Sequence, residues 1–455
     1  MSKKFTFRGG VHPPHCKSQT EHSRIEEFPA PDVAVIPLSQ HLGAPATALV
    51  EKGDRVLLGQ AIGELGGNVS AAVHASVAGT VLSVRPFAHP SGRLVKAVQI
   101  ENDGTDEAVP FEPVEDTWRE AARGELVNKI TECGIVGMGG AGFPTHVKLL
   151  PPSRKPIDTV IINGTECEPY LTDDHRIMVE RVEDILTGAQ IIKKILGARD
   201  VFFAIEDNKQ EAINIVSNKT VGSRYNDIKV ATLKSKYPQG GEKVLIMALT
   251  GRQVPAGGGL PMDVGCVVQN VSTALAVFEA VTQGIPLYKR VVTVTGAGVR
   301  SPKNLMVRIG TPARALLNAC GVDVGGAKKI IMGGPMMGLA LSDLDVPIIK
   351  TTSALLSLTE STEAVRKYPC VNCGICLKVC PLRLIPSRMA KFVEKGNFDD
   401  AVKWNLMECT ECGTCAYACP AKINLVQFFR MGKNKVLAGR AAEKKKAVPI
   451  KQGAT

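Results

Sequence analysis

The spacing of hydrophobic positions changes along the chain, and each change predicts a different kind of secondary structure. Near the N-terminus, short apolar runs are separated by Gly and Asp, a pattern typical of strands joined by turns. The expected strands span residues 32–37, 55–58, 61–65, 71–74, 79–84 and 95–100. They predict a small all-β module over residues 32–104, preceded by a strap of residues 1–31.

Farther along the chain, strands alternate with helical stretches. Apolar, β-branched runs predict strands at residues 158–163, 201–205 and 228–233. Apolar residues recur every three or four positions over residues 176–196, which predicts one helix there. A second helix is predicted at residues 209–217. This alternation is typical of an α/β sheet covered by helices, which we expect over residues 120–285.

A smaller unit follows, with strands expected at residues 291–295 and 303–309. Thr311 as cap and Pro312 as first helical residue predict a helix that runs to Cys320. This order resembles the soluble-ligand-binding β-grasp (SLBB) modules found beside electron-transfer domains, expected here over residues 288–350.

The N-terminal β module resembles the barrel-sandwich fold of biotinyl and lipoyl carriers. Those carriers present a lysine at a hairpin tip, whereas residues 66–70 of this chain contain none. We therefore expect a structural module without a swinging arm.

Eight of the 13 cysteines form two copies of the spacing C-x2-C-x2-C-x3-C-P. The copies are Cys370, Cys373, Cys376 and Cys380, then Cys409, Cys412, Cys415 and Cys419. In this bacterial ferredoxin pattern, three thiolates of a run hold one [4Fe–4S] cluster and the fourth ligates the other cluster. We therefore predict crossed ligand sets, with Cys419 completing the first cluster and Cys380 the second. The helical two-cluster domain is expected over residues 360–430.

Disulfide and zinc assignments of these cysteines fit the sequence less well. A disulfide framework suits a small secreted chain, and a zinc site would need only four ligands with looser spacing. The remaining cysteines are scattered and are interpreted as small buried hydrophobes: Cys16, Cys133, Cys167, Cys266 and Cys320. A further group could suggest a metal site, but its irregular spacing favours a surface strap: His12, His15, Cys16 and His22.

Composition describes an ordinary globular protein, with 44% hydrophobic and 22% charged residues. No run of about 18 apolar residues occurs, so no membrane-spanning helix is expected. The net charge is +11, and part of the excess lies in a basic tail of residues 431–455, most simply a disordered, solvated end. Because only 5% of residues are aromatic and no nucleic-acid motif occurs, nucleic acid is not an expected partner.

A glycine-rich loop at residues 137–142 matches G-x-G-x-x-G. An ordinary dinucleotide site would need a strand before this loop and a long helix after it. Here residues 126–133 have a helical pattern, and Pro151 arrives too soon. The glycines still allow the backbone amides of this loop to approach a phosphate or a planar ring closely, because no side chain blocks them.

Four motifs in the same order resemble the flavin-bearing, NADH-oxidising subunit of respiratory complex I. They lie at residues 137–149, 163–169, 241–243 and 270–273. Together with the opening residues 9–14, the whole arrangement is more similar still to the RnfC subunits of the Rnf electron transport complexes. The resemblance covers nearly the full chain.

This resemblance implies a bound FMN and a binding site for NAD(H). The FMN contacts would come from Gly137, Gly139, Gly140, Ala141, Gly142, Phe143, Lys148, Asn163, Asn270 and Thr273. Glu166, Glu168 and Glu242 would contact the nicotinamide and ribose, although carboxylates also occur on solvated faces or as helix caps. No side chain is expected to act as a catalytic acid or base.

The resemblance further implies a peripheral subunit of a membrane-bound NAD:ferredoxin oxidoreductase on the cytoplasmic side of the cell membrane. It would exchange a hydride between NAD(H) and FMN and relay single electrons through two [4Fe–4S] clusters. Its partners would be membrane subunits that couple redox to ion transport and a ferredoxin-like subunit, so its membrane contact would be indirect. Two alternatives remain, namely a soluble NADH dehydrogenase or diaphorase subunit and a non-catalytic polyferredoxin scaffold.

Overall fold

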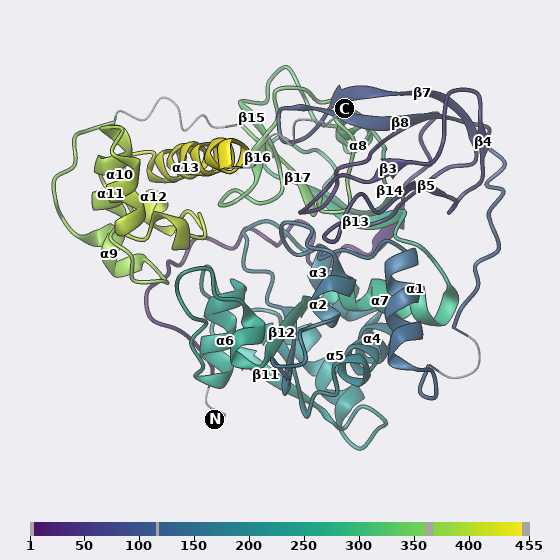
Figure 1. Cartoon of the computed structure of the whole chain (residues 1–455), viewed down its shortest axis with the longest axis horizontal. Helices are drawn as coiled ribbons and strands as arrows, with labels where there is room; N and C mark the ends of the chain where they lie inside the picture. The colour runs from purple at the N-terminus through teal and green to yellow at the C-terminus, as the bar shows by residue number, and fades with distance from the viewer. Residues whose placement is uncertain (1–3, 115–117, 360–366, 448–455) are drawn as a thin grey trace, which may run out of the picture.

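The computed structural model describes residues 4–114, 118–359 and 367–447. Two β-rich units lie on one side of the molecule, and an α/β domain lies below them in Figure 1. A helical domain made by the last part of the chain stands at the left of that view. The N-terminal segment runs along these units instead of forming a body of its own.

The N-terminal β module consists of two small sheets with one apolar core. One sheet has the order β2 (Val33–Pro37), β8 (Leu94–Asn102), β7 (Gly79–Ala88) and β4 (Arg55–Val56). The other has the order β3 (Thr47–Ala48), β5 (Ala61–Glu64) and β6 (Val73–His74). All six strands expected from the sequence are present, and only the two-residue β3 was not predicted.

The α/β domain is built on a parallel sheet that is covered on both faces. The strand order is β11 (Ile228–Leu233), β10 (Asp200–Glu206), β9 (Thr159–Gly164) and β12 (Cys266–Asn270). Val160 and Ile162 are buried in the core formed with α4 (Val182–Leu196) and α7 (Val271–Gln283), whereas Ile161 between them is buried against α6 (Glu242–Thr250). A strand buried on both faces explains the continuous apolar run in the sequence.

The helices of this domain are α1 (Arg123–Glu132), α2 (Thr145–Leu149), α3 (Asp173–Glu180), α4 (Val182–Leu196), α5 (Gln210–Thr220), α6 (Glu242–Thr250), the short 3-10 helix η1 (Pro261–Val264) and α7 (Val271–Gln283). The structure confirms the helices expected at residues 126–133 and 209–217, which are α1 and α5, and it corrects the one expected at residues 176–196. The single helix expected over residues 176–196 is wrong, because the chain breaks at Arg181. There the Arg181 guanidinium donates to Asp184 of α4 and to Glu279 of α7, and these two helices pack together.

The SLBB unit forms a six-stranded sheet. It contains β13 (Lys289–Thr295), β14 (Lys303–Arg308), β15 (Lys329–Met332), β16 (Leu339–Ala340) and β17 (Ala354–Leu358), with helix α8 (Ala313–Ala319) packed on its core. The sixth strand, β1 (Ile25–Glu27), comes from the strap and pairs in parallel with β14. The predicted cap is one residue off, since Pro312 occupies the N-cap position and the Thr311 hydroxyl donates to the Arg308 carbonyl.

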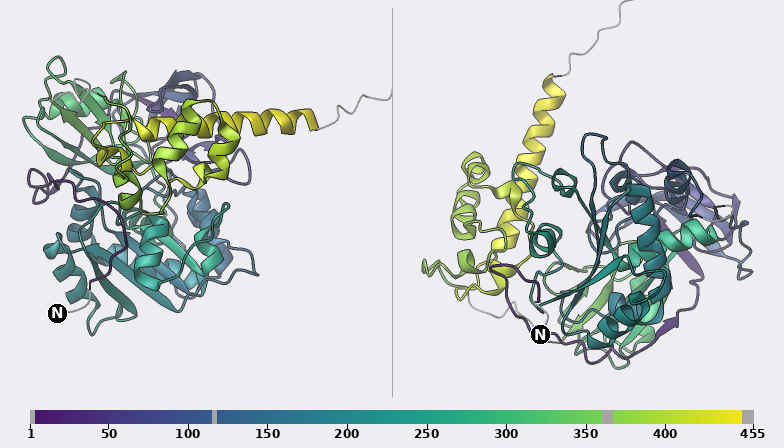
Figure 2. Two further views of the ribbon diagram at one scale, coloured as in Figure 1. Left: turned by 90° about the vertical axis from the view of Figure 1, so that its left-hand side faces the viewer. Right: turned by 90° about the horizontal axis from the view of Figure 1, so that it is seen from below.

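The C-terminal domain is helical, as expected. Its helices are α9 (Ile375–Val379), α10 (Pro386–Glu394), α11 (Phe398–Lys403), the 3-10 helix η2 (Leu406–Glu408), α12 (Thr414–Tyr417) and α13 (Leu425–Ala447). The interpretation of the tail as a disordered end is wrong as far as Ala447, because α13 continues to that residue and projects beyond the body (Figure 2). The rest of the tail lies outside the described residues.

The strap touches every unit. Phe5 bridges to β11, Val11 to Tyr237, and β1 to the SLBB sheet. His12, His15, Cys16 and His22 are exposed, as expected for a surface strap, so the interpretation of Cys16 as buried is wrong. In contrast, Lys17 and Thr20 are buried, although no sequence signal predicted it.

Candidate functional site

The glycine-rich loop lies at the start of α7. Gly137 donates its amide to the Phe143 carbonyl at 2.9 Å, which closes residues 137–143 into a compact turn. The Met138 amide donates to Thr273 Oγ1 at 3.0 Å and fixes the loop on the first turn of α7. A Cβ on Gly139 would lie 2.8 Å from the Asn270 side chain, whereas a Cβ on Gly140 would enter open space. Of these two glycines, only Gly139 is therefore required by the protein's own packing.

Two asparagines end neighbouring strands at the carboxyl edge of the sheet. Asn163 of β9 and Asn270 of β12 are register partners. Asn270 caps α7 through a bond from the Ser272 amide and donates to Asp174 at 2.6 Å. Asn163 donates to the Gly240 carbonyl at 3.0 Å. The carboxyl edge of a parallel sheet is where α/β domains bind ligands.

Lys148 and Glu242 meet at the same edge. Lys148 Nζ lies 2.8 Å from Glu242 Oε1 and 3.2 Å from the Val268 carbonyl. Glu242 is the first residue of α6, and both side chains are partly exposed. The pair is therefore accessible from solvent.

The remaining predicted residues are positioned differently. Glu166 is buried, and its carboxylate pairs with Lys17 at 3.1 Å and Lys209 at 3.9 Å. It also accepts the His175 amide, so Glu166 is held inside the protein by these contacts. Ala141 and Phe143 stay within the glycine loop, and a Cβ on Gly142 would crowd the Gln40 carbonyl at 2.9 Å.

Glu168 forms a junction between the α/β domain and the SLBB unit. Its carboxylate accepts the Met336 and Met337 amides at 3.0 and 2.9 Å and lies 3.4 Å from the Tyr237 hydroxyl oxygen. Burial raises the pKa of Glu168 to about 7, against the opposing effect of the two backbone amides. The carboxylate is therefore engaged in the protein's own contacts with the SLBB unit and Tyr237.

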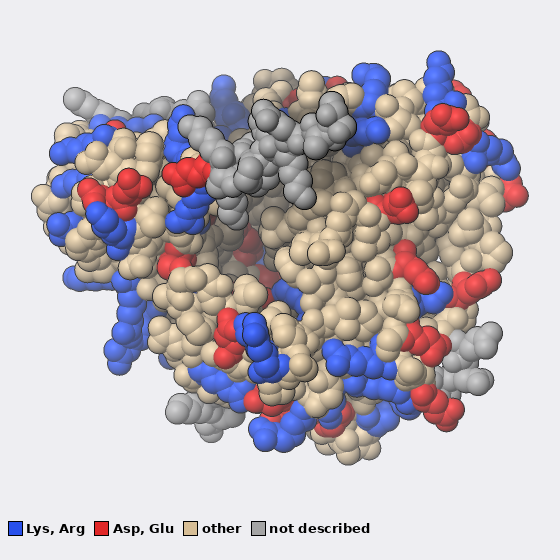
Figure 3. Space-filling view, viewed as in Figure 1, with Lys and Arg blue, Asp and Glu red and all other residues tan. Residues whose placement is uncertain are grey.

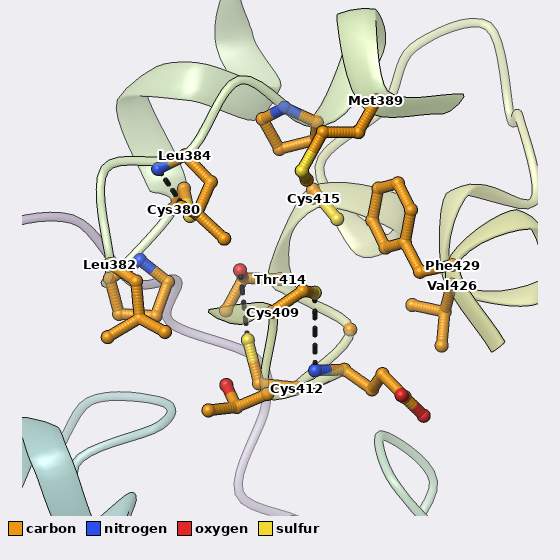
Figure 4. A pocket seen from close by; sticks show the side chains of 15 residues that line it. Cys380, Leu382, Leu384, Met389, Cys409, Cys412, Thr414, Cys415, Val426 and Phe429 are labelled. Carbon is orange, nitrogen blue, oxygen red and sulfur yellow. Dashed lines mark hydrogen bonds between the residues drawn. The ribbon is translucent and has the colours of Figure 1, made fainter. Parts of the chain in front are cut away.

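Four cysteines from both copies of the motif line one hollow (Figure 4). They are Cys380, Cys409, Cys412 and Cys415, which form one of the two predicted crossed sets. Backbone amides of Leu384 and Glu411 donate to the sulfurs of Cys380 and Cys409. Burial raises the pKa of the Cys409 thiol to about 11, so cluster binding must displace protons.

The ligands of a four-iron cube meet it at separate corners. Nowhere in residues 4–114, 118–359 and 367–447 do three His, Cys, Asp or Glu side chains converge on a point that one ion could occupy. The second crossed set, Cys370, Cys373, Cys376 and Cys419, stays a prediction, although helices α9 and α12, which carry or adjoin several of these residues, lie side by side.

Tyr237 connects the two sites. Its hydroxyl donates to the Cys412 carbonyl at 2.7 Å, and the same oxygen lies 3.4 Å from the Glu168 carboxylate. Tyr237, Cys412 and Val11 form a small apolar core against which Cys167 and Met336 pack. Lys243, next to Glu242, also pairs with Glu408, which precedes Cys409. No sequence signal singled out Tyr237, because a lone tyrosine carries no motif.

The residues present fit both cofactors. Gly140 faces open space that a flat ring or phosphate can approach, and the α7 N-terminus favours an anion. Beside Gly240, Gln239 is fully buried, and within the described residues neither atom of its amide has a hydrogen-bond partner. A polar ligand would satisfy such an amide. The four thiols around one hollow fit a [4Fe–4S] cluster.

Four family models match separate parts of the chain. They are the RnfC barrel sandwich hybrid domain (residues 5–105), the Nuo51 FMN-binding domain (130–279), the SLBB domain (291–340) and the 4Fe-4S dicluster domain (369–423). Together with the site, they define a modular flavin and iron–sulfur protein of electron transport. FMN and two [4Fe–4S] clusters are the cofactors that these domains imply.

Two curated relatives identify the family. A Clostridium ljungdahlii protein, the C subunit of a proton-translocating ferredoxin:NAD(+) oxidoreductase complex, is 46% identical over 97% of this chain and 96% of its own length. Its Na(+)-translocating counterpart from Acetobacterium woodii is 43% identical over 96% of this chain and 98% of its own. The chain belongs to the RnfC family, the family of these subunits of Rnf ferredoxin:NAD+ oxidoreductase complexes.

Among solved structures, an NAD+-reducing [NiFe]-hydrogenase in the H2-reduced state is similar, with a TM-score of 0.48 and 16% identity. That alignment covers 76% of this chain and 72% of the hydrogenase chain. Within the described residues, none of the helices is long and apolar enough to cross a bilayer.

Proposed function

We propose that this protein exchanges a hydride between NAD(H) and FMN at the carboxyl edge of the α/β sheet and passes single electrons to the cluster held by Cys380, Cys409, Cys412 and Cys415. A bound FMN supplies the step from two-electron to one-electron chemistry, because a [4Fe–4S] cluster takes one electron at a time. The observation that carries the proposal is the contact of Tyr237 with both Glu168 and Cys412.

The chain's own residues have separate tasks in this proposal. The glycine loop offers backbone amides, with Gly140 leaving room for the ring, while Asn163, Asn270 and Thr273 orient the loop and α7. Lys148 offsets the charge of the phosphate or ring. Glu242 and Glu168 are the candidates for nicotinamide and ribose contacts. Glu166 has an indirect role, because its carboxylate is paired with Lys17 inside the protein and so holds the loop of residues 164–171 in place.

A hollow on the face of Figure 3 supports an approach route for the nucleotide. It opens between the iron–sulfur domain and the rest of the molecule, with both acidic and basic side chains in view. Mixed charges at a nucleotide entrance suit a ligand that carries phosphates and a polar amide. The cluster of Cys370, Cys373, Cys376 and Cys419 would then pass electrons to the partner subunits.

The location and partners follow from the same proposal. The protein would sit peripherally on the cytoplasmic side of the membrane, bound to membrane subunits and a ferredoxin-like subunit. The curated relatives named above are subunits of ion-translocating complexes, which supports this arrangement.

Anaerobic spectroscopy of the purified holoprotein tests the proposal. NADH should bleach the flavin absorption of the wild type, and dithionite should reduce the clusters in every variant. Gly140→Val should lose FMN at unchanged iron content, because its side chain would enter the open space that the ring needs.

Three outcomes would contradict the assignment. A Gly140→Val variant that retains full FMN would remove this loop from the flavin site. A flavin-loaded wild type that does not respond to NADH would favour the scaffold alternative, and full activity of the isolated protein without any membrane partner would favour the soluble dehydrogenase.

A further inference from the structure

We propose that the N-terminal strap is a positioning element for electron transfer: Lys17 fixes the loop of residues 164–171 at the flavin site, and Gly9 and Gly10 fix the segment that carries Cys380. This inference rests on the proposed function. It assigns a role to a segment outside the α/β and iron–sulfur domains whose chemistry it serves.

Lys17 is the flavin-side anchor. Its ammonium donates to the carbonyl oxygens of Glu166 at 3.0 Å and Glu168 at 3.1 Å and to that of Leu171. It also pairs with the Glu166 carboxylate at 3.1 Å, and the lysine is only 5% exposed. One buried charge thus gathers three backbone carbonyls of a single loop.

The loop needs such an anchor because its backbone is strained. Glu166 and Tyr170 have φ values of +45° and +72°, in the left-handed region that residues with a Cβ rarely adopt. Such conformations persist only when the surroundings fix them. The strap supplies a second constraint, since the His15 carbonyl accepts the Tyr170 amide at 2.9 Å.

This loop carries Glu168, which reaches the SLBB unit and Tyr237. A shift of the loop would therefore move Glu168 and disturb the carboxyl end of β9, where Asn163 lies. Small misplacements of a positioning group can slow a reaction about a hundredfold.

The cluster-side anchor lies a few residues earlier in the strap. Gly10 donates its amide to the Val379 carbonyl at 2.8 Å, and a Cβ on Gly9, whose φ is +84°, would lie 2.8 Å from the Cys380 carbonyl oxygen. Val11 and Tyr237 exchange two backbone hydrogen bonds of 2.9 Å each. Residues 9–17 therefore form one continuous link between the supports of the flavin and of the cluster.

The first experiment compares Lys17→Met with Lys4→Met in the full-length holoprotein. Lys4 lies in the same strap but pairs with Asp207 at the surface, so it controls for the loss of a strap charge. In Lys17→Met, amide hydrogen exchange of residues 164–171 should rise, and NADH reduction of the flavin should slow at least tenfold at unchanged FMN and iron content. Lys4→Met should behave as wild type.

The second experiment tests the cluster-side anchor with Gly9→Ala. Gly53→Ala is the matched control, because Gly53 also has a positive φ but a Cβ there would meet nothing within 4 Å. Gly9→Ala should keep wild-type NADH reduction of the flavin, change the EPR signal that depends on Cys412, and slow electron transfer onward. Gly53→Ala should change neither signal.

The outcomes separate this inference from the proposed function. If wild-type flavin does not respond to NADH, the proposed function fails. If wild type responds and Lys17→Met responds at the same rate with unchanged exchange, the strap inference fails while the proposed function stands. Loss of FMN in Lys17→Met would also overturn the inference, since the strap would then act in flavin retention. If Lys17→Met does not yield folded protein, Lys17→Gln, which lacks the charge and the reach of the ammonium but keeps an amide N–H in the buried site, must show the same changes to a smaller extent. Wild-type exchange and reduction in that variant would overturn the inference.

Discussion

Lys350 shows, at the scale of one residue, how the units are joined. Its ammonium is buried and donates to the Ala72 carbonyl of the β module and the Gly134 carbonyl of the α/β domain, both at 2.7 Å. Burial lowers the pKa of Lys350 to about 7, well below that of an exposed lysine. Lys350 of the SLBB unit thus joins the β module to the α/β domain. Above about pH 7 its amine is neutral, so the sequence charge alone does not predict this contact between units.

This pKa predicts a pH dependence of stability. Between about pH 7 and the ordinary lysine value of 10.5, the unfolded chain binds the proton that the folded chain has lost. The free energy of unfolding contributed by Lys350 therefore increases as the pH rises through this window and is lost as the pH falls from 10.5 to about 7. Each unit of pKa difference corresponds to about 1.4 kcal/mol, so the rise amounts to a few kcal/mol.

Anaerobic denaturation of wild type and Lys350→Met at pH 7 and pH 9 measures this effect. The wild type should gain stability relative to the variant as the pH rises, because only the wild type carries the titrating amine. A difference between the two that is the same at both pH values would contradict a buried amine with a lowered pKa.

The secondary-structure elements show what periodicity can and cannot predict. Strand β11 was expected at residues 228–233 and spans Ile228–Leu233, because its apolar residues pack locally on both faces of a sheet. The break at Arg181 has no Pro or Gly to mark it in the sequence, and Arg181 pairs there with Asp184 and with the distant Glu279. Strand β1 is equally unpredictable, because its partner β14 lies far away in sequence.

The residues of the candidate site also fall into two groups, those that motifs predict and those whose roles depend on contacts distant in sequence. The glycine loop, Asn163, Asn270, Lys148 and Glu242 could be chosen from motifs, and they meet at one edge of the sheet. Glu166 belongs to a motif too, but a distant lysine of the strap draws its carboxylate inward. Lys17 and Tyr237 carried no signal, because their roles depend on contacts between separate units.

The crossed pairing of the cysteine runs is a prediction at the scale of elements. Because Cys380 follows α9 but lines the hollow with Cys409, Cys412 and Cys415, Cys380→Ser should change the EPR signal that is also lost in Cys412→Ser. Cys373→Ser is the control and should affect the other signal. Grouping of Cys380 with Cys373 would mean that each run holds its own cluster.

At the scale of the whole molecule, the basic end of the chain is a helix that leaves the body. The first turns of α13 pack in the core of the iron–sulfur domain through Leu425 and Phe429. Lys433 still belongs to that domain, because it pairs with Glu411 at 2.9 Å and donates to the Cys409 carbonyl. Beyond it, the helix projects from the rest of the protein in both views of Figure 2.

This geometry sharpens a test of membrane attachment. Truncation after Asn434 removes Lys435, Arg440, Lys444, Lys445, Lys446 and Lys451 but keeps the Lys433 contacts. If the basic helix contributes to attachment, the truncated protein should leave washed membranes at a lower salt concentration than the full-length protein. Exposed charges are screened as the Debye length falls from about 10 Å at 0.1 M to about 3 Å at 1 M salt.

A full-length variant with these six basic residues changed to Gln separates charge from length. It should release like the truncation, because each basic residue near an anionic surface contributes about 1 kcal/mol and Gln contributes no charge. Iron and FMN content should stay at the wild-type level in both variants, since neither touches the cluster ligands or the glycine loop. Equal release of all three proteins across the salt range would assign attachment to the other faces of the molecule.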